Sequence, residues 1–258
     1  MPAAFAEGNL TLPNEVAVSL TVLDSYLLAS AVPIAASALG VYHATYGVRS
    51  QWLGPTDWHG RTDTSSVALT FDDGPSADTD LVLSTLRTLG TPATFFMIGR
   101  QVERQPQIAR RVAAEGHEIG NHSYSHPIYL YRSGRETRRQ LQRAQEVITA
   151  ATGTTPRFSR PPCGVRTPAY FSATREMELR TVQWSVAGFD WKRIGAARIA
   201  YNILQDVRPG SIILLHDGDS SLKRDRIQTV MALPIIINGL KRRGLRVVPL
   251  SQLLDGKD

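Results

Sequence analysis

Between residues 67 and 250 the sequence alternates between short apolar runs and longer segments whose apolar residues recur at helical spacing. Apolar runs with the length of buried strands occupy residues 67–69, 93–98, 117–120, 157–160, 181–184, 211–215 and 245–249. Helical spacing covers residues 78–89, 102–115, 135–151, 168–178, 196–207 and 227–242. This alternation predicts an α/β fold with a parallel sheet, either a closed barrel or an open doubly wound sheet, and about seven strands favour barrel-like closure.

The N-terminal region has a different composition. Residues 25–46 contain no charged side chain apart from one histidine, and residues 27–36 are apolar enough for a membrane anchor or the core of a signal peptide. Asp24 and Pro33 interrupt this pattern, and no positive charge precedes it. Two interpretations stay open: an anchor or uncleaved signal that associates with a membrane through residues 16–46, and helices that pack on the catalytic domain.

We therefore expect three parts in this chain of 258 residues. They are an apolar N-terminal helical segment over 1–48, a linker rich in Gly, Pro, Asp and Thr over 49–66, and a catalytic domain over 67–258. An anchor or signal predicts a location outside the cytoplasm, in the cell envelope or secreted. We expect the protein to be a monomer.

The catalytic part is basic. The first 48 residues contain three acidic residues and no Lys or Arg, so the net charge of +6 becomes +9 over residues 49–258. Such an excess suits a polyanion, an anionic membrane surface or an anionic cell-wall polymer. The basic residues are spread along solvent-facing helix positions, and no nucleic-acid motif accompanies them, so we expect no nucleic-acid partner.

Two adjacent carboxylates, Asp72 and Asp73, follow the first apolar run. Neighbouring side chains of a regular strand point to opposite faces, and the break at Gly74 and Pro75 lets both acids face one site. The ends of parallel strands are where α/β enzymes keep their chemistry. A solvated acidic turn is the alternative for this tetrapeptide on its own.

Histidines also follow predicted strands. His122 and His126 are four residues apart, so a helical turn would bring both imidazoles to one ion, unless they are surface or capping residues. His216 ends the most apolar run and is either a core residue or a catalytic acid or base. The single cysteine, Cys163, excludes a thiolate cluster, so any metal must be held by His and carboxylate.

Two further strand ends carry polar groups. Arg160 precedes two prolines that stiffen its loop, and it is placed to hold a carboxylate, unless it is a surface residue. Asp190 and Trp191 add a carboxylate and an aromatic wall, with a core tryptophan as the alternative. Together with the acids and histidines, these groups predict a metal hydrolase site at one face of the fold.

Taken in chain order, these residues and their neighbours form motifs that resemble those of a known family. T-F-D-D-G-P at 70–75, H-S-x-x-H-P at 122–127, R-P-P-x-G at 160–164, D-W at 190–191 and L-L-H-D at 214–217 resemble the five motifs of the polysaccharide deacetylases with a NodB homology domain, carbohydrate esterase family 4. The resemblance spans about residues 67–250. It implies a distorted (β/α) barrel and a metal-dependent deacetylase that acts on acetylated sugars.

The resemblance also implies roles for individual residues. Its metal ligands are Asp73, His122 and His126, its general base is Asp72, and its general acid is His216. Arg160 would orient Asp72, Asp190 would hold His216, and the backbone N–H of Cys163 would bind the oxyanion. The expected substrate-binding residues are Trp191, Leu215 and Pro162. Two imidazoles and one carboxylate leave open positions on a divalent ion, which predicts one zinc, with cobalt, nickel and manganese as alternatives.

The sequence leaves the substrate open. Cys163 stands where the family usually has an aromatic residue, and this changes the surface that contacts the sugar. Peptidoglycan N-acetylglucosamine is the first expected substrate and chitin-type oligomers the second. The alternatives are an acetylxylan esterase, a deacetylase or amide hydrolase of small molecules, and a carbohydrate-binding pseudoenzyme.

Overall fold

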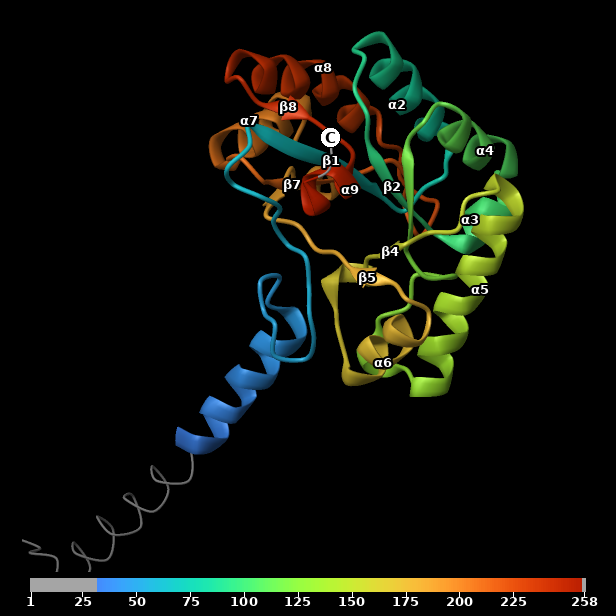
Figure 1. Cartoon of the computed structure of the whole chain (residues 1–258), viewed down its shortest axis with the longest axis vertical. Coiled ribbons are helices and arrows are strands. Elements are labelled where there is room, and N and C mark those ends of the chain that lie inside the picture. Colours follow the sequence, from blue (N-terminus) through green and yellow to red (C-terminus); the bar gives the residue numbers. More distant parts are fainter. Residues whose placement is uncertain (1–31, 257–258) are drawn as a thin grey trace, which may run out of the picture. The chain divides into compact units, whose positions relative to one another are not determined.

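The computed structural model describes residues 32–256, and contacts divide the chain into two units, residues 1–43 and 44–258 (Figure 1). Residues 32–46 are helical. Of the anchor or signal predicted over 16–46, residues 16–31 lie outside the described residues. Within the described part of the chain, no helix has the length and hydropathy that crossing a membrane requires.

A parallel sheet forms the centre of the second unit (Figure 1). Within the described residues its strands are β1 (Ser66–Asp72), β2 (Thr94–Met97), β3 (Glu118–Asn121), β4 (Phe158–Ser159), β5 (Arg180–Thr181), β6 (Val186–Ala187), β7 (Ile212–His216) and β8 (Arg246–Val247). Their order is β5-β4-β3-β2-β1-β7-β6, with β8 paired to β1, and every pair is parallel. The predicted α/β class and distorted barrel are confirmed.

The segment expected to be a linker, residues 49–66, lies against the sheet. Asp57 forms a bridge with Val182 just beyond β5, and His59 forms a bridge with Ser211 just before β7. The Gly60 N–H donates to the Gly210 carbonyl at 2.8 Å. This segment therefore connects the β5 side of the curved sheet to the β7 side, and its backbone contributes to closing the barrel.

Most of the helices lie around the outside of the strands, whereas α9 (Leu250–Asp255) shares an apolar cluster with Ala68 and Phe96 of the sheet (Figure 1). The helices are α2 (Ala77–Thr88), α3 (Gly99–Arg104), α4 (Pro106–Ala114), α5 (Gly134–Thr152), α6 (Pro168–Glu176), α7 (Ala196–Asp206), α8 (Ile227–Arg242) and α9. The single helix predicted over 102–115 is two helices, because Pro106 has no N–H to continue α3 and starts α4 instead. The two-residue strand β6 and the short helix α9 were not predicted.

Alternation along β1 separates two apolar layers. Val67, Leu69 and Phe71 belong to the large cluster between the sheet and its helices, which includes residues of α2, α7 and α8. Ala68 belongs to a second cluster with residues of other strands and of α9. Thr70 and Asp72 share the inner face with Ala68, so the polar end of β1 lies inside the barrel.

Candidate active site

The turn after β1 presents its two carboxylates to the same space. Asp72 ends the strand, and Asp73 has a φ of 76°, so the chain leaves strand geometry one residue before the predicted break at Gly74. A Cβ on Gly74 would lie 2.1 Å from Oδ2 of Asp217, so only glycine fits there. Both acids are buried.

Asp73, His122 and His126 form a group whose ligand atoms all lie within 4.8 Å of one another. Oδ1 of Asp73 is 3.3 Å from Nε2 of His126 and 3.6 Å from Nε2 of His122. This oxygen is buried without a hydrogen-bond partner in the described structure. Nδ1 of His122 donates to the carbonyl of Arg160 at 2.8 Å, which turns Nε2 toward Asp73. An orphaned carboxylate oxygen facing two imidazole nitrogens fits a divalent metal ion.

The two histidines lie on an irregular loop after β3, so the predicted helical turn is wrong, although the two rings are 5.0 Å apart. Ser123 and His126 have positive φ angles of 67° and 59°. The Ser123 N–H donates to Oδ1 of Asn121 and the His126 N–H donates to Oγ of Ser123, each at 2.9 Å. Burial lowers the pKa of His126 to about 4, so its imidazole is neutral at pH 7.

Asp72 is paired with Arg160 inside the barrel. Nη1 of Arg160 donates to Oδ1 of Asp72 at 2.7 Å and to the Thr70 hydroxyl at 2.9 Å. Nη2 donates to the carbonyl of Gln183 at 3.0 Å, and the guanidinium lies 4.1 Å from the centroid of the Phe96 ring. These contacts fix the carboxylate in one orientation, which suits a group that accepts a proton.

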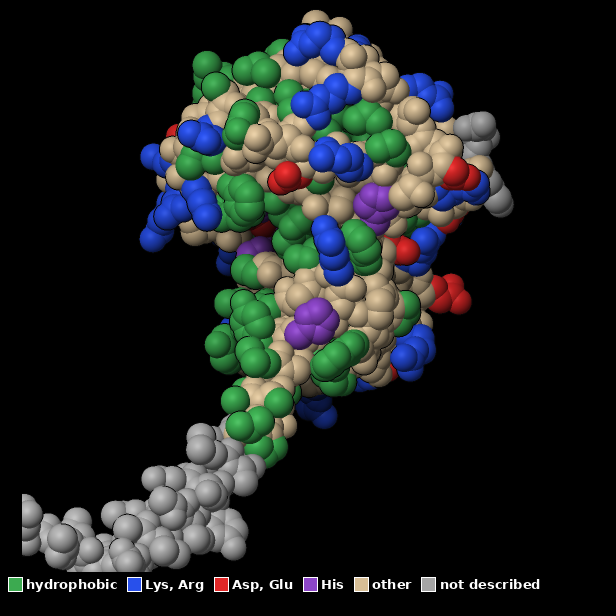
Figure 2. Space-filling model, turned by 90° about the vertical axis from the view of Figure 1, so that its left-hand side faces the viewer, with side chains coloured by type: hydrophobic (Ala, Val, Ile, Leu, Met, Phe, Trp, Pro, Cys, Tyr) green, Lys and Arg blue, Asp and Glu red, His purple; other side chains and the backbone are tan. Residues whose placement is uncertain are grey.

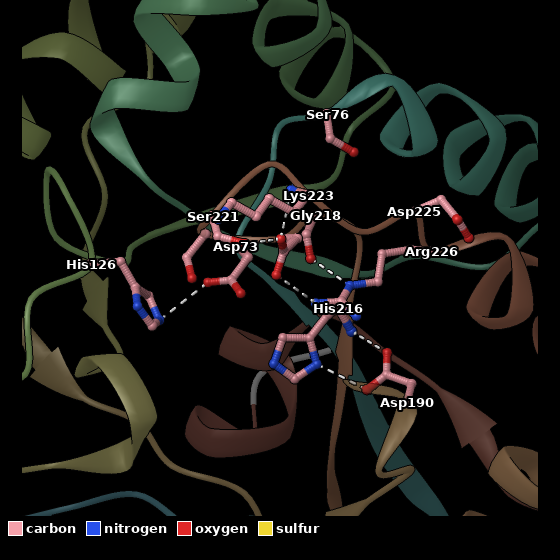
Figure 3. A network of polar contacts seen from close by, with 12 residues as sticks. Asp73, Ser76, His126, Asp190, His216, Gly218, Ser221, Lys223, Asp225 and Arg226 are labelled. Atoms are coloured by element: carbon pink, nitrogen blue, oxygen red, sulfur yellow. Dashed lines mark hydrogen bonds and ion pairs between the residues drawn. The ribbon is translucent and has the colours of Figure 1, made fainter. Parts of the chain in front are cut away.

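His216, which is partly exposed, and the buried Asp190 form the second pair (Figure 3). Nδ1 of His216 donates to Oδ1 of Asp190 at 2.9 Å, and the His216 N–H donates to Oδ2 at 2.7 Å. The Thr229 hydroxyl donates to Oδ2 at 2.8 Å. Burial alone would lower the pKa of His216, but the charge of Asp190 and its hydrogen bond outweigh burial and raise it to about 9. The imidazole is therefore protonated at pH 7.

The register of β1 and β7 shows which residues share a face with these groups. His216 is opposite Asp72, Leu214 is opposite Thr70, and Leu215 is opposite Phe71. Leu215 packs with Phe71 in the outer cluster, so it does not line the site as expected. Leu214 is the leucine on the face of His216, and two-residue alternation back from His216 would have identified it.

The other expected substrate-binding positions lie near the site. The Trp191 ring is edge-on to the His216 ring at 5.3 Å. Pro162 is buried in a short 3-10 turn, and Cys163 in the same turn has a φ of 55°. Cys163 is exposed, yet partial burial of its thiol and the charges of Asp73 and Asp72 raise its pKa. The charges of the two acids therefore act on the turn after β4.

Asp217 holds the turn after β1 in place through hydrogen bonds. Its position after His216 in the sequence did not indicate this role. Its Oδ1 accepts the Gly74 N–H at 3.2 Å, and its Oδ2 accepts the Thr79 hydroxyl at 2.6 Å. Its carbonyl accepts the Ser76 hydroxyl at 2.6 Å. Burial raises the pKa of Asp217 to about 7.

Known proteins share this sequence and fold. The family model for polysaccharide deacetylases matches residues 59–182. A chitooligosaccharide deacetylase of Bradyrhizobium sp. is 41% identical over 199 residues, which cover 74% of this chain and 91% of the relative. The solved structure of the Bc1960 peptidoglycan N-acetylglucosamine deacetylase superposes with a TM-score of 0.72 at 37% identity, covering 78% of this chain and 92% of that one. The structure of BA3943 of Bacillus anthracis, a CE4 family pseudoenzyme, superposes with a TM-score of 0.71 at 30% identity. The match covers 78% of this chain and 69% of that one. The chain belongs to the polysaccharide deacetylases of carbohydrate esterase family 4.

Proposed function

We propose that this protein is a metal-dependent hydrolase that removes acetyl groups from the N-acetylglucosamine residues of peptidoglycan, with chitin-type oligomers as the second substrate. One observation carries the proposal: the Asp73, His122 and His126 group lies at the same strand ends as two separate ion pairs, Asp72 with Arg160 and His216 with Asp190. One pair holds a proton acceptor and the other a proton donor.

The donor set supports a divalent ion held by Asp73, His122 and His126. Two imidazole nitrogens and one carboxylate oxygen leave positions open, as catalytic zinc sites do. We infer zinc, with cobalt, nickel and manganese as alternatives that accept the same donors. When bound, the ion would lower the pKa of water and polarise the acetyl carbonyl.

The residues of the chain divide the proton transfers between them. Asp72, held by Arg160, accepts the proton of the attacking water. His216, kept protonated by Asp190, gives a proton to the amine nitrogen as the C–N bond breaks. The backbone N–H of Cys163 donates to the oxyanion, and Trp191 and Leu214 line the space for the acetyl methyl group.

Two observations support this choice of polymer: the names of the relatives and the net charge of the chain. The relatives carry the names of chitooligosaccharide and peptidoglycan deacetylases. The charge of +9 over residues 49–258 favours an anionic wall polymer. Lys and Arg side chains lie scattered over the face shown in Figure 2 rather than in one patch. We therefore propose that the enzyme acts outside the cytoplasm, either associated with a membrane through residues 16–46 or secreted. We also propose that it acts as a monomer.

Release of acetate from defined polymers tests the proposal. Zinc-loaded protein is incubated with peptidoglycan, N-acetylated chitin oligomers and acetylxylan, and acetate and the deacetylated product are measured by mass spectrometry. Asp72→Asn protein is the matched control. Acetate from the N-acetylated polymers that disappears in the control supports the proposal. Release from acetylxylan alone indicates an esterase, and release from none of the polymers by metal-loaded protein indicates a pseudoenzyme.

A further inference from the structure

Phe189 is an exposed aromatic residue directly beside the pair formed by His216 and the buried Asp190. Its side chain is 40% exposed, whereas the next residue, Asp190, is fully buried. Phe189 has a φ of 56°, a conformation that bulky residues rarely adopt. It belongs to none of the apolar clusters of the described residues. Packing in the core therefore does not account for this ring.

The loop that carries Phe189 is fixed on both sides of the ring. Gln228 of α8 donates from Nε2 to the Asp190 carbonyl at 2.7 Å and accepts the Gly195 N–H at Oε1 at 2.9 Å. Nδ2 of Asn202 in α7 donates to the Gly188 carbonyl at 3.3 Å. Because the flanking backbone is held in this way, the exposed ring is presented in a defined position rather than by a free loop.

Three rings lead from the proton donor to this surface. The His216 and Trp191 centroids are 5.3 Å apart with nearly perpendicular planes, at 73°. The Trp191 and Phe189 centroids are also 5.3 Å apart, at 60°. In the proposed mechanism the sugar that loses its acetyl group places its nitrogen at His216. The Phe189 ring is two ring contacts away from that imidazole, within reach of a neighbouring sugar of the same polymer.

We propose that the Phe189 ring packs against the C–H face of the pyranose that adjoins the sugar being deacetylated. This inference rests on the proposed function and adds a neighbouring subsite to it. β-Linked pyranoses expose an apolar face of axial hydrogens, and a rigid, partly exposed aromatic ring covers such a face with little loss of side-chain entropy. Phe189 is thus a specificity residue that favours polymers over short acetylated sugars.

Chain-length dependence tests the subsite. We compare kcat and KM of the zinc-loaded wild-type and Phe189→Leu proteins on N-acetylglucosamine and on chitin oligomers up to the hexamer. The leucine side chain keeps the backbone strain but removes the aromatic face. For the long oligomers we expect KM to rise roughly 2- to 10-fold with kcat unchanged, as loss of an aromatic contact predicts. For N-acetylglucosamine itself, which has no neighbouring sugar to contact Phe189, we expect no change.

Two variants and a pH profile separate a subsite from a structural role. Phe189→Tyr keeps the ring and is expected to restore the wild-type dependence on length. Tyr201→Leu removes a ring that is 50% exposed on α7 and is expected to change nothing. An equal loss on all lengths, or a displaced alkaline limb, overturns the proposal, because it shows that Phe189 acts through Asp190. No loss on any length overturns it as well.

The same set of measurements distinguishes failure of the subsite from failure of the proposed function. Oligomer binding is followed through tryptophan fluorescence in parallel with acetate release. If the wild type binds long oligomers through Phe189 but releases no acetate, the proposed function fails and the subsite stands. If acetate is released with the same length dependence in the wild type and in Phe189→Leu, the subsite fails and the function stands.

Discussion

The guanidinium of Arg160 donates to the carboxylate of Asp72 at 2.7 Å, and both side chains are buried in the barrel. Removing one partner of a buried ion pair leaves the other charge without compensation, which typically costs about 3–5 kcal/mol. Asp72 would then be held in water-poor surroundings without the donor that orients it. The pair therefore contributes to both the stability and the geometry of the site.

We predict that Arg160→Lys lowers kcat/KM roughly 10- to 100-fold, because an ammonium cannot reproduce the bonds that the guanidinium makes at once to Asp72 and Gln183. Arg160→Met is expected to lower the free energy of unfolding by about 3–5 kcal/mol as well. Urea unfolding and acetate release measure the two effects. Unchanged activity in Arg160→Lys would show that orientation of Asp72 is not limiting.

The neighbouring acids are expected to differ in their effect on metal content. Asp72→Asn keeps the three proposed ligands, so we predict about one metal ion per chain and a loss of turnover of at least roughly 100-fold. Asp73→Asn removes the carboxylate that faces both histidines, so we predict lost metal affinity. Metal analysis after dialysis and acetate release measure the two properties. If both variants lost metal equally, the division between base and ligand would be wrong.

The sequence correctly predicted that the polar residues at the strand ends lie close together. Parallel strands bring their carboxyl ends to one edge of the sheet, whatever the geometry of the loops that follow. Asp72 is the last residue of β1, and His122 and Arg160 directly follow β3 and β4, as expected. Their roles came from the resemblance, since the spacing alone also fitted surface residues. The order of motifs along the chain, rather than any single motif, therefore carried the prediction.

What the sequence did not predict depends on backbone geometry and on register. The spacing of His122 and His126 suggested a helix because it cannot indicate that Ser123 adopts a positive φ. The Gly- and Pro-containing segment before β1 suggested a linker, although its backbone pairs at Asp57 and His59 with residues distant in sequence. Both features need tertiary contacts that local patterns do not contain.

The raised pKa of His216 sets the expected alkaline limit of activity. As the proposed general acid, His216 must be protonated, so kcat/KM is predicted to fall as pH rises through about 9. The charge of Asp190 raises the pKa of His216 against the lowering effect of burial. Asp190→Asn removes this charge, so the pKa is expected to fall and the alkaline limb to move to lower pH. A pH profile of amide hydrolysis measures this shift. An alkaline limb that stays in place in Asp190→Asn would assign it to another group.

Removal of the metal is expected to abolish activity and lower stability together. A ligand that binds only the folded state stabilises it by about 2.7 kcal/mol at 100 times its Kd, so zinc at that concentration should raise the midpoint of thermal unfolding by roughly 5–10 °C over chelated protein. Acetate release and scanning calorimetry before and after zinc is restored measure both effects. Asp73→Asn protein is the control and should not respond to zinc. Full activity in demonstrably metal-free protein would contradict the mechanism.

The adjacent leucines of β7 provide a matched pair, because one faces the site and the other faces the helices. Leu215 packs with Phe71 outside the sheet, so Leu215→Ala is predicted to lower the free energy of unfolding by about 2–5 kcal/mol with little change in kcat/KM of the folded protein. Leu214 shares the face of His216, so Leu214→Ala is predicted to lower kcat/KM by more than Leu215→Ala does. Urea unfolding and acetate release at a temperature where both variants are folded separate the two effects. The opposite result, with Leu215→Ala impairing catalysis more, would restore Leu215 as the residue that lines the acetyl space.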